Sequence, residues 1–153
     1  MSKKSEIEST ATDAAARLQA RRFQRVREAH QTELAEDYVE LIADLIDTLG
    51  EARVVDLATR LGVSSATVNN ALQRLQRDGL VATKPYRSIF LTQDGHDLAK
   101  AARERHNVVR EFLASLGVDA VTADADAEGI EHHVSDATLN TFRAHLRRAK
   151  RGK

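Results

Sequence analysis

The sequence predicts a mainly α-helical chain, with a winged helix-turn-helix carrying a two-stranded wing, followed by an all-helical domain. Three patterns lead to this expectation. Apolar side chains recur at helical spacing in long stretches on both sides of residues 53–91. Within that range, a short helical pattern, a glycine-containing turn and a second helical pattern follow closely, as in a helix-turn-helix. Two short apolar runs then flank Pro85, which is typical of a β-hairpin.

The first long helix is expected from about Glu28 to Leu49, where Gly50 ends it. Residues 1–27 show no steady apolar period, so we expect them to form a mobile N-terminal extension. The predicted apolar stripe of the helix consists of Leu34, Tyr38, Leu41, Ile42, Leu45 and Leu49.

The helix-turn-helix is expected over residues 53–75, with its turn at Leu61-Gly62-Val63. Ser64 or Ser65 opens the second helix, because a serine hydroxyl can accept a hydrogen bond from an exposed amide of the first turn. The side chains expected on its buried face are Val68, Leu72 and Leu75. Residues 80–84 and 88–91 then form the two strands of the wing, joined by residues 85–87.

Three further helices complete the prediction. Thr92 is expected to cap one that runs to about Leu116, another spans about 120–133, and Ser135 caps the last. The expected divisions are therefore an extension at 1–27, the winged domain at 28–95, the helical domain at 96–148 and a frayed tail at 149–153.

The chain has no cysteine, which excludes disulfides, iron–sulfur clusters and cysteine-ligated zinc, and fits a reducing compartment. No apolar run approaches the roughly 20 residues of a membrane span, and the first residues lack the apolar core of a signal peptide. We therefore expect a cytoplasmic protein with no membrane partner.

The formal net charge is zero, but the charges are unevenly distributed. Residues 53–87 carry six basic and two acidic side chains, a net of +4. Residues 119–136 carry six acidic side chains and no lysine or arginine. The first segment suits phosphate and the second suits cations, so the neutral total does not exclude nucleic acid.

The second helix of the helix-turn-helix is expected to enter the major groove of double-stranded DNA by its N-terminal residues. The alternative is that the winged domain binds another protein and that its arginines form a solvated surface. The side chains expected nearest the base edges are Ser64, Ser65, Thr67, Asn69 and Asn70. Those better placed for the phosphate backbone are Arg53, Arg60, Arg74, Arg77, Lys84 and Arg87.

A cation site is predicted near the C-terminus. On a helix, Glu128, Glu131 and His132 share one face, because they stand at positions i, i+3 and i+4. Two carboxylates and one imidazole without a thiolate suit a divalent ion harder than zinc, such as manganese or ferrous iron.

Other residues can complete this site. Asp37 and Glu40 lie one turn apart on the first helix, and His106 lies in the middle of the helix after the wing. With the C-terminal trio they make four carboxylates and two imidazoles, whose charge two divalent ions would balance. Taken singly, an acid pair on a helix is usually surface decoration, and His106 could equally be a surface or core imidazole.

The remaining histidines are less informative. His133 points roughly 100° away from the trio, so we expect a supporting or structural role. His30 stands seven residues before Asp37 and could share its face, whereas His96 and His145 look incidental.

On these residues the chain resembles the manganese-responsive branch of the diphtheria-toxin-repressor family. The similarity covers about residues 37–144, and its strongest markers are Asp37-Tyr38-Val39-Glu40, Arg105-His106 and Glu128-Gly129-Ile130-Glu131-His132-His133. The resemblance implies a winged helix-turn-helix followed by a helical metal-binding and dimerisation domain. The metal ligands that it implies are Asp37, Glu40, His106, Glu128, Glu131 and His132. An oxygen ligand at Asp37 fits manganese better than the thioether usual in the iron-responsive branch.

The resemblance implies a manganese-dependent regulator that is not an enzyme and binds no small organic substrate. Two Mn²⁺ per subunit would promote binding of a homodimer to a palindromic operator, repressing metal-uptake genes and sometimes activating efflux genes. One alternative is an iron-responsive repressor of the same family, with Fe²⁺ in the site. The others are a di-metal carboxylate enzyme, whose Glu-x-x-His spacing does not occur here, and a regulator that senses an organic ligand.

Overall fold

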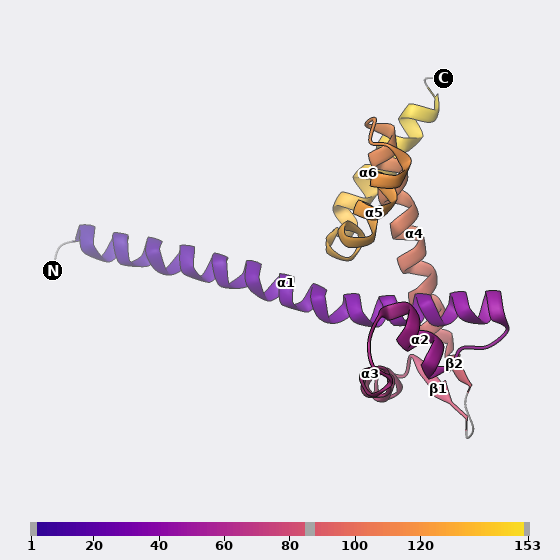
Figure 1. Ribbon diagram of the computed structural model, residues 1–153. Helices are drawn as coiled ribbons and strands as arrows, with labels where there is room; N and C mark the ends of the chain where they lie inside the picture. The colour runs from indigo at the N-terminus through magenta and orange to yellow at the C-terminus, as the bar shows by residue number, and fades with distance from the viewer. Residues whose placement is uncertain (1–2, 85–87, 152–153) are drawn as a thin grey trace.

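The computed structural model describes residues 3–84 and 88–151, which form helices and one antiparallel hairpin (Figure 1). The order is α1 (Lys3–Leu49), α2 (Val54–Leu61), α3 (Ser65–Arg77), β1 (Val81–Thr83), β2 (Ile89–Leu91), α4 (Gln93–Ser115), α5 (Ala120–Ile130), the 3₁₀ helix η1 (Glu131–His133) and α6 (Asp136–Arg151). The predicted winged helix-turn-helix and following helices are confirmed. None of the helices in these two ranges is long and apolar enough to cross a membrane.

One apolar core holds the winged part together. The C-terminal third of α1 packs onto α2, α3, the hairpin and the start of α4, and the residues that it contributes are fully or almost fully buried. The hairpin pairs Val81 with Leu91 and Thr83 with Ile89. Val81, Ile89 and Leu91 face this core, whereas Thr83 is exposed. The buried residues of the core are Tyr38, Val39, Ile42, Leu45, Ala52, Leu57, Val68, Leu72, Leu75, Val81, Ile89, Leu91 and Ala99.

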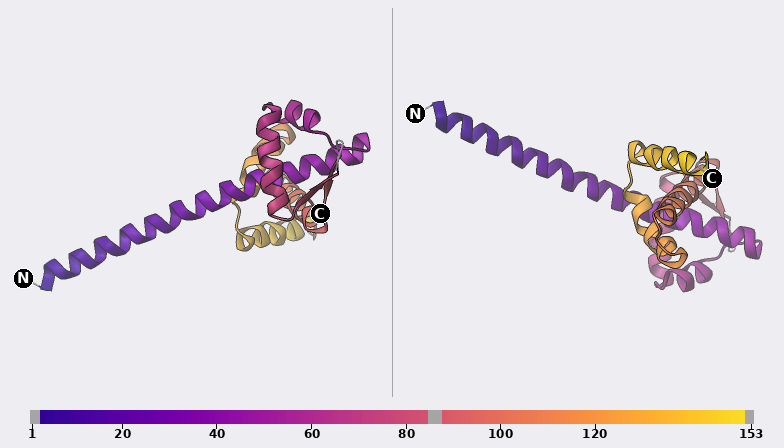
Figure 2. Two further views of the ribbon diagram at one scale, coloured as in Figure 1. Left: turned by 90° about the horizontal axis from the view of Figure 1, so that it is seen from below. Right: turned by 90° about the horizontal axis from the view of Figure 1, so that it is seen from above.

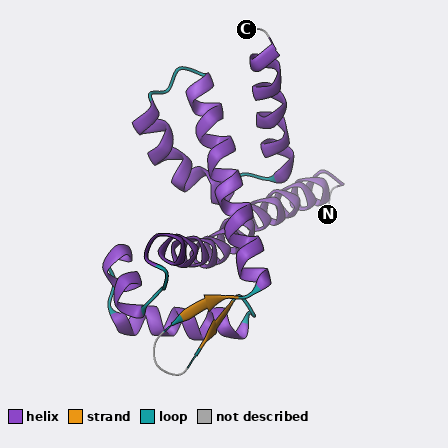
Figure 3. Cartoon of the chain, turned by 90° about the vertical axis from the view of Figure 1, so that its right-hand side faces the viewer, coloured by secondary structure: helices purple, strands orange, loops and turns teal. Residues whose placement is uncertain are grey.

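A second, smaller core joins α4, α5 and α6 around Val109, Ala127 and Leu139. Helix α4 contributes to both cores, since Ala99 belongs to the first and Val109 to the second. In Figure 3 the winged part lies below α1, and the C-terminal part of α4 with α5 and α6 lies above it. In both views of Figure 2, the N-terminal part of α1 extends away from both parts as a single long helix.

The predicted helix ends are largely confirmed. Ser64 caps α3, accepting a hydrogen bond from the Thr67 amide at 3.1 Å, and Thr92 caps α4 through the Gly95 amide. Gly62 adopts a left-handed conformation (φ +67°) in the turn between α2 and α3, where a side chain would be strained.

Several boundaries differ from the prediction. Helix α1 begins at Lys3, not near Glu28, because alanine, glutamate, lysine and arginine favour a helix even without an apolar stripe. Leu34 and Leu49 of the predicted stripe are exposed. The helix expected over 120–133 ends at Ile130 and tightens into η1, and α6 continues into the expected frayed tail as far as Arg151. The predicted turn at residues 85–87 lies outside the described residues.

Gly95 allows α4 to start directly against the wing. A β-carbon at this position would lie 2.1 Å from the carbonyl oxygen of Leu80, which is backbone and cannot rotate away. We expect Gly95→Ala to lower the free energy of unfolding by about 1–3 kcal/mol, as overpacking does. Thermal unfolding of the metal-free protein measures this effect, at roughly 2–4 °C per kcal/mol.

Gly129→Ala provides the matched control. Gly129 is also helical, and a β-carbon there would meet no atom within 4 Å. Alanine favours a helix more than glycine does, so this variant should unfold at the wild-type temperature or slightly above. If the two variants unfolded at the same temperature, the close approach of α4 to Leu80 would be wrong.

Candidate metal centre

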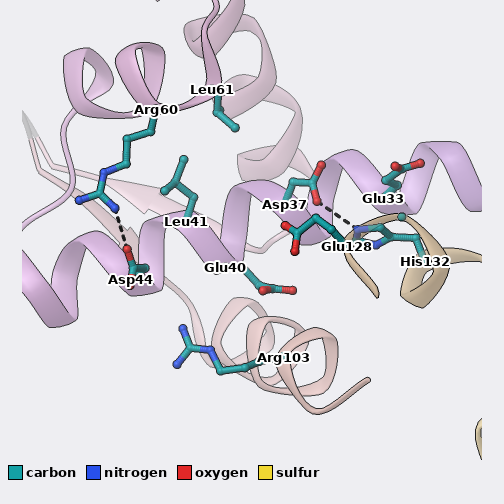
Figure 4. Close-up of a pocket in the computed structure, with 11 residues that line it drawn as sticks. Glu33, Asp37, Glu40, Leu41, Asp44, Arg60, Leu61, Arg103, Glu128 and His132 are labelled. Atoms are coloured by element: carbon teal, nitrogen blue, oxygen red, sulfur yellow. Dashed lines mark hydrogen bonds and ion pairs between the residues drawn. The ribbon is translucent and has the colours of Figure 1, made fainter. Parts of the chain in front are cut away.

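The six predicted metal ligands come together where α1, α4 and the α5–η1 segment meet. Asp37 and Glu40 lie on α1, His106 on α4, Glu128 on α5, and Glu131 and His132 on η1. Figure 4 shows the Asp37, Glu40, Glu128 and His132 side chains around one pocket, which has a volume of about 630 Å³. Asp37 and Glu128, which are 91 positions apart in the chain, therefore line the same cavity.

His132 connects the two halves of the site. Its Nε2 lies 3.2 Å from Asp37 Oδ1 and 3.6 Å from Glu131 Oε1 (Figure 4 marks the first contact). On the opposite side of the ring, Nδ1 donates to Glu36 Oε2 at 2.6 Å. These contacts with Asp37 and Glu36 raise the pKa of the buried imidazole to about 10. A metal ion can use Nε2 only after displacing its proton.

His106 joins α4 to the same group of acids. Its Nδ1 lies 2.7 Å from Glu131 Oε2 and 3.3 Å from Glu128 Oε2, and its Nε2 lies 3.1 Å from Asp124 Oδ1. Burial opposes protonation of this imidazole. The hydrogen bond with Asp124 and the charges of Glu131 and Glu128 outweigh burial and raise its pKa.

Two buried carboxylates of the site have incomplete hydrogen bonding within the described residues. Oε1 of Glu40 has no hydrogen-bond partner, and Oε2 of Glu131 lies 2.7 Å from His106 Nδ1 without being aligned for a hydrogen bond. Burial, followed by the charge of Glu128, raises the pKa of Glu40, and burial raises that of Glu131 to about 7. A buried carboxylate without a partner is costly. Bound cations would remove this cost, so the donor set fits a divalent metal.

The six side chains do not all converge on one point. In the part of the chain that the structure describes, the side chains that offer three ligand atoms within 4.8 Å of one another are His30, Glu33 and His133. Five of the six instead form a connected series of ion pairs, which runs from Asp37 through His132, Glu131 and His106 to Glu128. Glu40 stands outside this series. Mutual repulsion among four carboxylates favours such a spread arrangement.

Sequence reasoning missed three residues that support this site. Glu36 is only 3% exposed, and it binds Arg105 at 3.2 Å as well as His132. Asp124 binds His106 from α5. Arg105 was named only as part of the Arg105-His106 marker, and the one signal for Glu36 was its place immediately before Asp37.

The predicted DNA-facing residues lie on an exposed surface of α3 and beside the wing. Ser64, Ser65, Thr67, Asn69, Asn70, Arg74, Arg77 and Lys84 are exposed. The Ser64 and Thr67 hydroxyls lie 2.9 Å apart and contribute to the helix cap. Lys84 lies over the Phe90 ring, 5.3 Å from its centre. Arg87 lies outside the described residues.

Comparison with family models gives two matches that together span most of the chain. Residues 30–89 match the N-terminal DNA binding domain of the iron dependent repressor. Residues 92–152 match the metal binding and dimerisation domain of the same family.

The chain is also similar to individual transcriptional regulators. The chain is 56% identical over 121 residues to the transcriptional regulator MntR of Escherichia coli O6:H1, which covers 79% of the chain and 78% of that protein. It is 42% identical over 100 residues to the HTH-type transcriptional regulator MntR of Listeria welshimeri, covering 65% and 70%. A solved structure described as a manganese-dependent transcriptional repressor complex with manganese is 31% identical, with a TM-score of 0.66. The match covers 73% of this chain and 52% of that one, so the chain spans about half the length of that solved relative.

Proposed function

Because the chain belongs to the iron-dependent repressor family, the family of the diphtheria-toxin repressor, we propose that it is a manganese-responsive transcriptional regulator rather than an enzyme. The observation that carries this proposal is the meeting of ligands from α1, α4 and the α5–η1 segment beside a winged helix-turn-helix. The relatives named as transcriptional regulators, and the repressor structure with manganese, support the same function.

The residues that would hold the metal are Asp37, Glu40, His106, Glu128, Glu131 and His132. The donors are mainly carboxylate oxygens, which suits Mn²⁺ and also Fe²⁺. Two ions per subunit would supply the positive charge that balances four carboxylates. The alternative of an iron-responsive repressor is not favoured, since the solved relative described above is a manganese-dependent repressor by name.

The positions of these ligands couple metal binding to DNA binding. Asp37 and Glu40 lie on the helix that forms the winged core, whereas Glu128, Glu131 and His132 lie in the C-terminal part. Drawing these ligands together fixes the winged part relative to the C-terminal helices. A hundredfold gain in DNA affinity requires about 2.7 kcal/mol of coupling, which is within the usual range.

On the DNA side, we assign residues 28–95 to DNA binding, 96–148 to metal binding and dimerisation, and 1–27 to an N-terminal extension. A homodimer would place one α3 helix per subunit in successive major grooves of a palindromic operator, about 34 Å apart. The residues assigned to base edges are Ser64, Ser65, Thr67, Asn69 and Asn70, and those assigned to phosphates are Arg74, Arg77, Lys84 and Arg87. Repression of metal-uptake genes is the expected outcome.

Two measurements test this function. Equilibrium dialysis against Mn²⁺ should find about two ions per subunit. Selection from a random pool of DNA duplexes, with and without Mn²⁺, should enrich an inverted repeat only when the metal is present. Absence of manganese binding would refute the metal site, and enrichment that ignored manganese would refute the coupling.

The organic-ligand alternative predicts a different result. In that case the acids would be solvated surface groups, and no manganese would be retained in dialysis. The pairing of Glu131 and His132, both almost fully buried, speaks against solvated acids.

A further inference from the structure

A second group of histidine and carboxylate side chains lies beside the six proposed manganese ligands (the manganese centre) and has no residue in common with them. His30 and Glu33 lie on α1, and His133 is the last residue of η1. Each offers one ligand atom, and the three atoms all lie within 4.8 Å of one another. We propose that His30, Glu33 and His133 form a separate site for Zn²⁺.

The geometry of this group is close to that of a bound zinc ion. Glu33 Oε2 lies 3.0 Å from His30 Nδ1 and 3.5 Å from His133 Nε2. Zinc bonds to nitrogen and oxygen of about 2.0–2.1 Å place neighbouring tetrahedral ligands roughly 3.3 Å apart. The two imidazole rings meet edge to face, with their centres 5.0 Å apart. Small side-chain rotations are therefore enough to enclose an ion.

The chemistry of the donors separates this site from its neighbour. Two imidazoles with one carboxylate suit zinc, which accepts nitrogen ligands readily and tolerates a water in the fourth position. The manganese centre has four carboxylates for its two imidazoles, so its ligands are harder and favour Mn²⁺ over Zn²⁺. The His30 side chain is 62% exposed and that of His133 is 36% exposed, which leaves room for the water.

Exposed His–Glu pairs one turn apart are common on helices, so His30 with Glu33 alone would not indicate a metal site. The third donor is what distinguishes this group, because His133 comes from a different segment. Glu33 also lines the manganese pocket, one turn before Asp37 (Figure 4). Zinc at this place would hold α1 against η1, the two segments that His132 and Asp37 also connect.

His30→Ala tests the proposal with little risk to the fold, since the residue is exposed and alanine is the strongest helix former. Zinc retained after equilibrium dialysis should fall by about one ion per subunit in this variant relative to wild type. Glu33→Gln should lose the same ion. His96→Ala, which removes an exposed histidine from α4, should retain the wild-type amount.

Equal zinc content in wild type and His30→Ala would overturn the proposal. So would an equal loss in His96→Ala, because that would indicate unspecific binding to surface histidines. The same proteins dialysed against Mn²⁺ test the manganese centre separately. His30→Ala should keep all of its manganese, and failure of every protein to bind manganese would refute the proposed function without affecting the zinc comparison.

Discussion

Replacing Asp37 by alanine is expected to abolish the manganese dependence of DNA binding while leaving the fold intact. Asp37 is partly exposed, and from α1 it contacts Nε2 of His132, the ring nitrogen that faces the site. Without it, the manganese centre loses a link between the winged part and η1. A gain in DNA affinity of about a hundredfold on adding Mn²⁺, worth about 2.7 kcal/mol, should fall to nearly none. Fluorescence anisotropy of labelled operator, titrated with and without Mn²⁺, measures it.

Asp47→Asn is the matched control for this experiment. Asp47 is an exposed acid on the same helix, outside the pocket. Its replacement removes one negative charge and should leave the manganese response unchanged. If Asp37→Ala responded to manganese as the wild type does, Asp37 would not be a ligand, and the link between α1 and η1 would need another explanation.

The second large effect is expected at Glu36, which we do not assign as a metal ligand. Its carboxylate accepts from His132 Nδ1 and pairs with Arg105, and so fixes the ring whose Nε2 faces the site. A carboxylate behind a ligating imidazole orients the ring and strengthens it as a donor. Losing one typically lowers metal affinity by about 10–100-fold. We therefore expect Glu36→Gln to weaken Mn²⁺ binding by that factor, with the number of ions unchanged at saturation.

Calorimetric titration with Mn²⁺ separates this positioning role from ligation. A ligand variant should lose an ion at saturation, whereas Glu36→Gln should reach the wild-type count at higher concentration. Glu28→Gln, on an exposed part of α1, should titrate as wild type. A wild-type affinity in Glu36→Gln would show that Glu36 serves only to pair Arg105.

Local patterns in the sequence predicted most of the fold. Ser64, Gly62 and Thr92 act within one or two turns of their own position, so their roles could be read from neighbouring residues. The buried positions of α3 were equally accessible, because Val68, Leu72 and Leu75 repeat at helical spacing. These features depend on short-range geometry alone.

What the sequence could not predict depends on contacts between distant segments. Nothing near Glu36 in the chain indicates that it is buried, since its partners Arg105 and His132 lie 69 and 96 residues away. The start of α1 was missed for a different reason. An apolar stripe marks a helix that packs, whereas residues 13–28 are helical and exposed.

The arrangement of α1 also constrains how the protein can respond to metal. Asp37 and Glu40 bracket Val39, which is fully buried in the winged core, and one continuous helix carries all three. No hinge separates the ligands from that core. Metal binding therefore has to move the exposed face of α3 together with the winged part as one rigid body, and it does not change the shape of α3 itself. Amide hydrogen exchange within α3 should stay nearly constant on metal binding. Exchange at η1, where the C-terminal part contacts α1 of the winged part, should slow.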